Sequence, residues 1–312
     1  MITMTHIFII NPFAGHKTFA DNLRAKLNTI KNLDYFVFNT RYAGYEKELV
    51  RKILHIFEGE KLRFYCCGGS GTMRHMLNGF DCLDDVEVAF FPCGLTNDFL
   101  KNFGKDESRF HNIEELIDGD VIKVDYIKSN HGISLNSLST GMDSNCLRKM
   151  DDYRITRFIG KDMPYTFATL YSIFVSNPHE YEIMLDDETI TGKFAEIFIG
   201  NGCVFGGNMF FAEKTCVNDG KAISRIVGNK KAFTLLPSLI DLQKKKIHKL
   251  ETNMRCGECS KITIKRTSGA PFAINQDGDL IKGITVCEAE IVHKGLNFVV
   301  PKGVRVCEEA RE

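Results

Sequence analysis

The sequence has no excess of charge of either sign. Its 312 residues include 40 Lys and Arg and 40 Asp and Glu, so the formal net charge at pH 7 is zero. Domains that bind nucleic acid usually carry a strongly basic surface and a high pI, and nothing in this composition supports such a surface. We therefore expect no nucleic acid among the partners of this chain.

Long apolar runs are also absent. A helix that crosses a bilayer needs about 20 apolar residues, and the apolar run at Thr166–Val175 is too short. The first residues, Met1–His6, lack the basic start of a signal peptide and lead directly into a β-branched run. We expect a soluble, cytoplasmic protein that can still associate with a membrane surface.

The cysteines give no sign of a disulfide framework. There are eleven, an odd number, and several lie inside apolar runs, as Cys66 and Cys67 do. This usage is typical of a reducing compartment, where thiols serve as small core residues. The Cys256–Cys259 pair has the spacing of half a zinc site, but a second pair is not evident nearby. We interpret this pair as part of a turn between strands.

The chain is 44% hydrophobic, which is enough for more than one domain. Over residues 1–126, β-branched and apolar runs alternate with segments of helical spacing. This alternation predicts a Rossmann-like α/β domain, in which helices cover both faces of a parallel sheet. The predicted strands are His6–Ile10, Tyr35–Asn39, Leu62–Cys67 and Val86–Phe91, and the segment Phe99–Phe103 is predicted to be helical.

Residues 127–297 have a different pattern, with many short strand-like runs separated by turn residues. This pattern predicts an antiparallel β-sandwich domain, interrupted by a helical insert near Asp143–Phe174. The apolar start of the tail 298–312 is expected to return to the first domain. The predicted strands are Ile133–Leu138, Glu180–Leu185, Glu196–Gly200, Ile223–Val227, Lys261–Lys265 and Ile284–Val292.

Polar or glycine-containing turns follow all four predicted strands of the first domain. They are Asn11–Gly15, Thr40, Gly68–Thr72 and Pro92–Asp98. The carboxyl ends of parallel strands meet at one edge of a sheet, and ligands of open α/β sheets bind there. The sequence therefore predicts a binding site at this edge.

The glycine turn Gly68–Thr72 predicts a phosphate-binding loop. Glycines let backbone N–H groups approach an anion closely, and the start of the following helix favours negative charge. The turn has neither the Walker pattern nor the Rossmann glycine spacing. A turn that merely joins a strand to a helix is the alternative interpretation.

Five motifs in order resemble the diacylglycerol kinase catalytic family of soluble lipid kinases, which includes sphingosine and ceramide kinases. The motifs are Asn11-Pro12-Phe13-Ala14-Gly15, Gly68-Gly69-Ser70-Gly71-Thr72, Pro92-Cys93-Gly94-Leu95-Thr96-Asn97-Asp98, Asn218-Asp219-Gly220 and Asp277-Gly278-Asp279. The resemblance covers nearly the whole chain. It implies a nucleotide domain over 1–126, a β-sandwich lipid-substrate domain over 127–297, and ATP bound in the cleft between them. NAD kinases and phosphofructokinases have a similar glycine turn.

The resemblance also implies roles for individual residues. It places a nucleotide-associated Mg²⁺ near Asp98 and Asp125, and a structural Mg²⁺ at the Asp219 carboxylate with carbonyls near Cys216 and Lys221. The residues implied to contact ATP are Asn11, Gly15, Thr40, Gly68, Gly69, Ser70, Gly71, Thr72, Thr96, Asn97 and Asp98. For Asn11 and Thr40 the alternative is ordinary turn chemistry, and for Asp98 it is a helix N-cap.

Asp277 and Asp279 are the candidate general bases, because a carboxylate within hydrogen-bond reach can accept the proton of the attacking hydroxyl. The motif implies a base without saying which carboxylate acts. The alternative is a hairpin turn, for which Asp-Gly is a favoured dipeptide.

Three residues depart from the family pattern. Ser70 stands where the family has aspartate, Leu95 where it has threonine, and Asp279 where it has glutamate. Ser70 in place of aspartate removes one carboxylate from the implied metal network, and lower kinase activity is one expected consequence.

The sequence thus predicts a lipid kinase that requires ATP and Mg²⁺. It would phosphorylate the free hydroxyl of a diacylglycerol-like lipid and associate peripherally with the membrane during catalysis. A homodimer is one oligomeric state that the sequence allows. The alternatives are an NAD kinase-like enzyme and a weak or inactive regulator that binds lipid or nucleotide.

Overall fold

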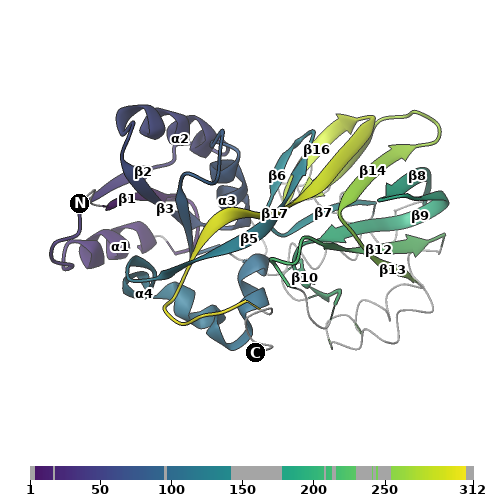
Figure 1. Cartoon of the computed structure of the whole chain (residues 1–312). Helices are drawn as coiled ribbons and strands as arrows, with labels where there is room; N and C mark the ends of the chain where they lie inside the picture. The colour runs from purple at the N-terminus through teal and green to yellow at the C-terminus, as the bar shows by residue number, and fades with distance from the viewer. Residues whose placement is uncertain are drawn as a thin grey trace. The chain divides into compact units, whose positions relative to one another are not determined.

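The computed structural model describes residues 4–16, 18–94, 97–141, 178–206, 209–212, 216–229, 241, 244 and 254–306. Its chain divides into two compact units (Figure 1). The first unit comprises Met1–Tyr126, Cys216–Asp219 and His293–Glu312, and the second comprises Ile127–Thr215 and Gly220–Val292. The predicted helical insert near 143–174 lies outside the described residues.

A parallel sheet forms the centre of the first unit, as the sequence predicts. Its strands pair in the order β2-β1-β3-β4, and residues 297–299 of β17 add a further parallel strand beside β4. Strands β1 and β3 are buried along nearly their whole length, which is typical of parallel strands covered on both faces. The strands are β1 (Met4–Ile10), β2 (Tyr35–Asn39), β3 (Lys61–Gly68), β4 (Glu87–Pro92) and β17 (Val286–Val300).

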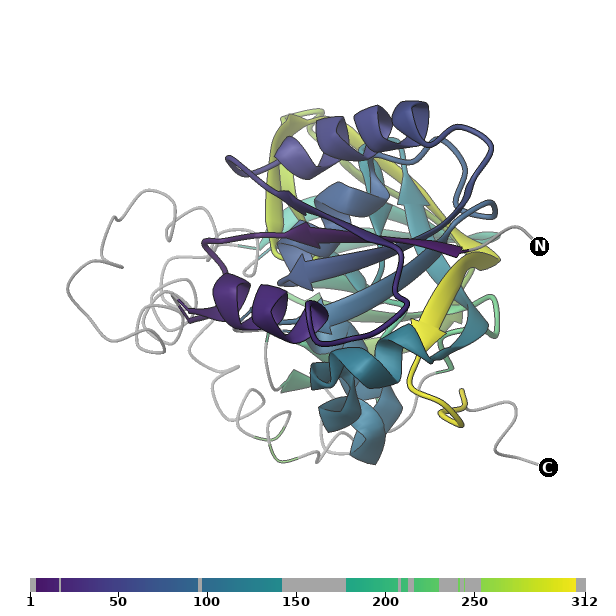
Figure 2. The same cartoon turned by 90° about the vertical axis from the view of Figure 1, so that its left-hand side faces the viewer.

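Helices follow the strands of this sheet and cover it. Figure 2 shows α1 and α2 on opposite sides of β1, as right-handed crossovers in opposite directions require. Helix α2 buries Leu49, Val50 and Ile53, which lie on one face at helical spacing. The helices are α1 (Phe19–Leu27), α2 (Tyr45–Ile56), α3 (Ser70–Leu77) and α4 (Ile113–Ile117).

The segment after β4 is helical, as predicted, and its helical turns are of the 3₁₀ type. It forms 3₁₀ turns over η1 (Asp98–His111), broken at Gly104, where φ is +58°. Its rings pack against Phe298 of β17, with centroid distances of 5.3 Å for Phe99 and 6.1 Å for Phe103. This aromatic packing holds the segment against the sheet.

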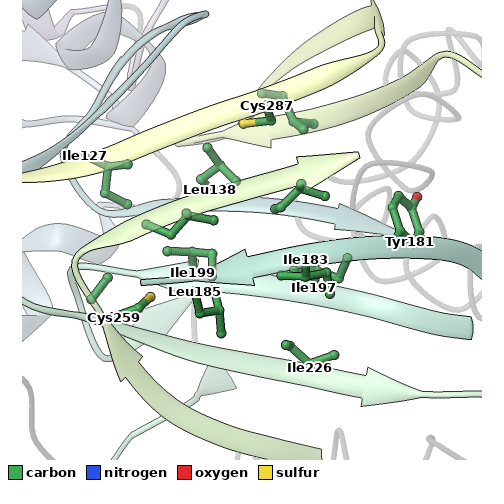
Figure 3. Packing of buried hydrophobic residues seen from close by; sticks show 14 of the residues in the cluster. Ile127, Leu138, Tyr181, Ile183, Leu185, Ile197, Ile199, Ile226, Cys259 and Cys287 are labelled. Carbon is green, nitrogen blue, oxygen red and sulfur yellow. The ribbon is translucent and has the colours of Figure 1, made fainter. Parts of the chain in front are cut away.

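The second unit is an antiparallel β-sandwich, as predicted. Strands pair in the order β16-β15-β7-β9-β8-β14-β17, and β12 joins β9 and β13. Figure 3 shows buried side chains such as Leu138, Ile183 and Ile197 filling the space between these strands. Strand β5 (Asp120–Ser129) begins in the first unit and ends in the second. The other elements are β6 (Gly132–Ser134), β7 (Ser137–Gly141), β8 (His179–Leu185), β9 (Glu188–Gly200), β10 (Val204–Phe205), β11 (Met209–Phe210), β12 (Ala222–Gly228), β13 (Met254–Cys259), β14 (Lys261–Arg266), β15 (Phe272–Gln276) and β16 (Asp279–Ile284).

Two local predictions for this unit are wrong. The single strand expected over Ile133–Leu138 is interrupted between β6 and β7, because the backbone there binds a carboxylate described below. The Cys256–Cys259 pair lies inside β13 and not in a turn. Residues three apart on a strand point to opposite faces, and accordingly Cys256 is exposed while Cys259 is buried.

Within the described ranges, no helix has the length and apolar character needed to cross a membrane.

Burial of His6 makes the stability of the first unit depend on pH. Burial, and then the charge of Arg63, lower the pKa of His6 from 6.5 to about 4, and its Nδ1 lies 2.7 Å from the Tyr65 hydroxyl. Between these two pH values the unfolded chain binds more protons at this site, so stability falls as the pH falls. We expect this residue to account for a loss of about 2–3 kcal/mol between pH 7 and pH 4.5.

Urea unfolding at several pH values measures this effect. The variant His6→Gln should lose this part of the pH dependence, whereas His55→Gln, at an exposed position, should keep it. An unchanged pH dependence in His6→Gln would refute the assignment.

Candidate functional site

Backbone hydrogen bonds link the turns at the carboxyl edge of the parallel sheet. Each of three turns donates an N–H to the carbonyl of a neighbouring strand end at 2.9 Å. The bonds are Asn11 to Cys67, Thr40 to Ile10, and Cys93 to Gly68. The turns after β1, β2, β3 and β4 therefore lie side by side, as the parallel order requires.

A side-chain bond joins two of the predicted nucleotide contacts. The Asn11 amide Nδ2 donates to the Thr72 hydroxyl at 2.9 Å. Thr72 is buried in the first turn of α3, and Thr40 is buried at the end of β2. Their roles toward ATP stay predictions, but the structure brings these three polar side chains to one edge.

Close packing between turns explains most of the glycines at this edge. A Cβ placed on Gly94 would lie 2.6 Å from the Gly69 Cα, and one on Gly68 would lie 2.5 Å from the Thr72 Cβ. Gly15 has a φ of +71°, and a Cβ there would lie 2.9 Å from the Cys93 carbonyl oxygen. Gly15 and Gly94 thus let the turns after β1, β3 and β4 approach one another, and Gly68 makes room for Thr72 of its own turn.

Gly71 is different. A Cβ on this residue would meet no atom within 4 Å, so packing does not explain the missing side chain. Gly71 lies in the first turn of α3, which begins at Ser70 after an extended Gly69. The first N–H groups of a helix have no intrahelical acceptor and attract anions. The space beside Gly71 is therefore open, and an anion such as a phosphate group could approach the helix start there.

Asn97 and Asp98 add oxygen acceptors to the same edge. The Asn97 Nδ2 donates to the Gly94 carbonyl at 3.2 Å, while its buried Oδ1 accepts no hydrogen bond within the described part of the chain. Asp98 is 8% exposed, with the Lys101 Nζ at 3.5 Å from its Oδ1. It is the first residue of η1 and not its N-cap. Thr96 lies outside the described residues.

Asp125 is fully buried on β5, where backbone groups surround it. Its Oδ1 accepts the Lys294 N–H at 2.6 Å and lies 3.1 Å from the His293 Nδ1. Its own N–H donates to the Val217 carbonyl at 2.6 Å. Asp125 thus connects β5 with β17 and with the segment that carries the Asn218-Asp219-Gly220 motif.

That segment offers further oxygen atoms. The Asn218 Oδ1 is buried and accepts no bond from a described residue, whereas Asp219 is exposed. Cys216 is half-buried, and the Lys221 side chain pairs with Glu258 at 2.8 Å. Across the described ranges, no three His, Cys, Asp or Glu side chains gather as a metal-binding group. The two predicted Mg²⁺ sites stay predictions.

Asp277 binds backbone rather than standing open at a surface. It is 7% exposed and has a φ of +50°, and with Gly278 (φ +89°) it forms the two-residue turn between β15 and β16. Asp-Gly suits such a turn because both positions need positive φ. Its carboxylate accepts N–H groups from Leu135 at 2.6 Å, Asn136 at 3.1 Å and Ser137 at 2.8 Å. Both oxygens therefore serve the fold.

We expect Asp277→Asn to destabilise the second unit by about 3 kcal/mol or more. The side-chain NH₂ of Asn would face backbone N–H groups that now donate to the carboxylate, and two donors cannot form a hydrogen bond. Each hydrogen bond to a charged group that is lost is worth about 1.5–3 kcal/mol. Urea unfolding measures the change, with Asp187→Asn, an exposed acid in the same unit, as the matched control. Equal stability of the two variants would contradict this role.

Asp279 is placed differently. It is the first residue of β16, opposite Gln276, and is half-buried. Of the two candidate bases, its carboxylate is the one whose oxygens are not both committed to the three N–H groups of Leu135–Ser137. Which of the two carboxylates acts as the base stays a prediction.

Sequence reasoning missed the backbone partners of Asp277. They lie about 140 positions earlier in the chain, and any residue supplies a backbone N–H. No local pattern could have revealed them.

Comparison with known families matches both parts of the chain. Residues 5–129 match the diacylglycerol kinase catalytic domain, and residues 136–306 match the YegS C-terminal NAD kinase beta sandwich-like domain.

Curated proteins with similar sequences carry lipid kinase names. The chain is 38% identical over 106 residues to “Putative lipid kinase YtlR” of Bacillus subtilis (strain 168), an alignment of 32% of this chain and 33% of that protein. It is 26% identical over 173 residues to “Putative lipid kinase SAS0691” of Staphylococcus aureus (strain MSSA476), which covers 55% of this chain and 56% of that protein. Each alignment spans less than two thirds of the relative's own length.

Solved structures show the same fold. A crystal structure described as “a putative diacylglycerol kinase from Bacillus anthracis str. Sterne” has a TM-score of 0.72 at 18% sequence identity. The alignment covers 96% of this chain and 96% of that chain. A second structure from that organism, described as a diacylglycerol kinase, has a TM-score of 0.66 at 17% identity, with 96% of this chain and 98% of that chain covered.

Proposed function

Because the chain belongs to the diacylglycerol kinase catalytic-domain family, with a YegS-type C-terminal domain, we propose that it is an ATP-dependent lipid kinase. It transfers the γ-phosphate of ATP to the free hydroxyl of a diacylglycerol-like lipid. The observation that carries this proposal is the start of α3, where Gly71 leaves open space beside the first turn of the helix, whose N–H groups have no acceptor one turn earlier in the helix.

The residues at the carboxyl edge of the sheet fit a nucleotide's phosphates. Backbone N–H groups at Gly71 and Thr72 would bind phosphate oxygens, and the Asn11–Thr72 bond would hold the hydroxyl in place. The buried Asn97 Oδ1 and the Asp98 carboxylate are oxygen acceptors of the kind that Mg²⁺ prefers. When bound, the ion would neutralise charge on the transferring phosphoryl group.

Asp279 is proposed to accept the proton of the lipid hydroxyl as that hydroxyl attacks the γ-phosphorus. The β15–β16 turn carries this carboxylate, and Asp277 anchors the turn to the Leu135–Ser137 backbone. This anchoring holds the turn that precedes Asp279 in place. We also propose a cytoplasmic location with peripheral membrane contact, because the acceptor lipid resides in a bilayer.

Ser70→Asp tests the main departure from the family. A carboxylate within about 4 Å of the metal contributes at most about 4 kcal/mol per unit charge at an effective dielectric near 20, before desolvation. Even a fraction of this should lower the Mg²⁺ concentration for half-maximal activity severalfold.

The control Ser70→Asn introduces a side chain of nearly the same size as Asp but without its charge. It should leave the Mg²⁺ dependence of the activity near that of the wild type. If Ser70→Asp binds Mg·ATP no better and turns over no faster, Ser70 does not lie at the metal site.

An assay with labelled ATP and a panel of lipids in mixed micelles tests the proposed reaction. The NAD kinase-like alternative would show itself as NAD phosphorylation in the absence of lipid and detergent. A regulator would bind ATP and transfer no phosphate to any acceptor. The glycine turn favours neither alternative, whereas the match of residues 5–129 to the diacylglycerol kinase catalytic domain supports the lipid kinase.

A further inference from the structure

Strand β2 forms an edge of the parallel sheet in the first unit. Among the described strands, it pairs with β1 alone. The outer side of an edge strand presents a row of backbone N–H and C=O groups that another chain can bind. The outer side of β2 is therefore a candidate surface for a partner.

The hydrogen bonds to β1 show which residues of β2 face outward. The His6 N–H donates to the Asp34 carbonyl at 3.0 Å, and the Thr40 N–H donates to the Ile10 carbonyl at 2.9 Å. In a parallel pair, alternate residues turn both backbone groups toward the neighbouring strand. The even-numbered residues therefore face β1. The residues whose backbone groups face away from it are Tyr35, Val37 and Asn39.

Helices cover the two faces of β2 but do not bind its outer backbone groups. On one face, the Tyr35 hydroxyl donates to the Asn28 Oδ1 at the end of α1 at 2.7 Å. On the other face, the Phe36 ring lies 4.7 Å from the ring of Phe57, which follows α2. Within the described ranges, the outward N–H and C=O groups of β2 have no hydrogen-bond partner.

The sequence of β2 lacks the features that normally protect an edge strand. Natural edge strands carry charges, proline or a bulge, which prevent pairing with another chain. Strand β2 reads Tyr-Phe-Val-Phe-Asn, without a charged residue or proline, and its pairing with β1 is regular. Phe36 is also 42% exposed. An uncharged edge of this β-propensity is expected to pair.

Charges beyond the two ends of β2 favour a second copy of the chain as the partner. Asp34 precedes the strand and Arg41 follows it; both are exposed, and no ion pair joins either of them to a described residue. The Arg41 Cζ lies 5.6 Å from the centroid of the Tyr45 ring, and Glu48 on α2 is paired with Lys52 at 2.6 Å. A two-fold axis reverses the strand, so the Asp34 end of each copy meets the Arg41 end of the other.

We propose that two copies of this chain associate by antiparallel pairing of their β2 strands, with Val37 at the two-fold axis. Val37 then exchanges backbone hydrogen bonds with Val37 of the other copy, and Tyr35 does so with Asn39. Phe36 lies opposite Phe38 of the other copy at a position without backbone bonds, where side chains approach most closely. Aromatic pairs at such positions stabilise antiparallel sheets. The association does not depend on the kinase reaction.

Sedimentation velocity of the full chain over a range of micromolar concentrations measures the association. Val37→Pro removes the N–H at the centre of the proposed pairing but none of the bonds to β1, because Val37 faces away from β1. The control Val37→Thr has nearly the same size and keeps the N–H. We expect the wild type and the control to form dimers and Val37→Pro to dimerise at least about tenfold more weakly. Circular dichroism verifies that each variant folds.

Charge reversal identifies a second copy as the partner. Asp34→Lys alone and Arg41→Glu alone each place like charges at both ends of the pairing, so each should weaken self-association about tenfold. An equal mixture of these two variants should form dimers again. The introduced lysine of one variant then meets the introduced glutamate of the other, and the native pair meets at the opposite end. Mixing cannot repair a variant that fails to fold.

Dimers of the wild type that are lost in Val37→Pro, and dimers that return in the mixture of charge variants, are the results expected. The proposal is overturned if the wild type remains a monomer at all concentrations. It is equally overturned if folded Val37→Pro dimerises as the wild type does, or if the mixture of charge variants associates no better than either variant alone.

Discussion

Gly71→Asp is expected to abolish ATP binding while leaving the chain folded. The expectation has two parts, that the variant folds and that it no longer binds ATP. A side chain at Gly71 meets no atom within 4 Å, so the fold accepts it. The same side chain would occupy the space proposed for phosphate, and two unit charges 4 Å apart repel by about 4 kcal/mol at an effective dielectric of 20. That corresponds to a loss of about a thousandfold in affinity.

Gly71→Asn is the matched control, because it has nearly the same size and no charge. It should weaken ATP binding less than Gly71→Asp, and the difference isolates the charge. Isothermal titration with ATP, together with circular dichroism to verify folding, makes the measurement. Wild-type affinity in a folded Gly71→Asp variant would show that phosphate binds elsewhere.

Asp279→Asn is expected to lower the rate of lipid phosphorylation by about 10²–10⁴-fold, the usual contribution of a positioned general base. The amide cannot accept the proton of the hydroxyl. Affinity for ATP should be unchanged, since Asp279 is not among the residues proposed to contact the phosphates. The loss should appear in kcat and not in the KM for ATP.

Asp279→Glu provides the control, because it restores the longer carboxylate typical of the family and should keep most of the rate. Asp277→Asn provides the contrast, because its main expected effect is on stability. Near-wild-type activity of Asp279→Asn would remove Asp279 from the mechanism.

The sequence predicted the parallel sheet well because its signals are local. The strand Tyr35–Asn39 has the predicted bounds, and three others differ by one or two residues at one or both ends. Once four strands are parallel, their carboxyl ends must share an edge. Asn11 and Thr72, 61 positions apart, could therefore be placed together from the sequence, and the structure joins them by a hydrogen bond.

Features that depend on distant partners escaped prediction. The interruption between β6 and β7 exists because Asp277 binds the backbone there. The 3₁₀ turns of η1 pack on Phe298, almost 200 residues later.

The most direct test of the kinase proposal is the initial rate at which label moves from γ-labelled ATP to diacylglycerol in mixed micelles. The wild-type chain and Asp279→Asn should be compared at equal concentration, with NAD as the only acceptor in a parallel reaction. We predict a labelled lipid product from the wild type, a rate at least about 100-fold lower for the variant, and no labelled NAD. Labelled NAD, or no labelled lipid across the whole lipid panel, would contradict the account.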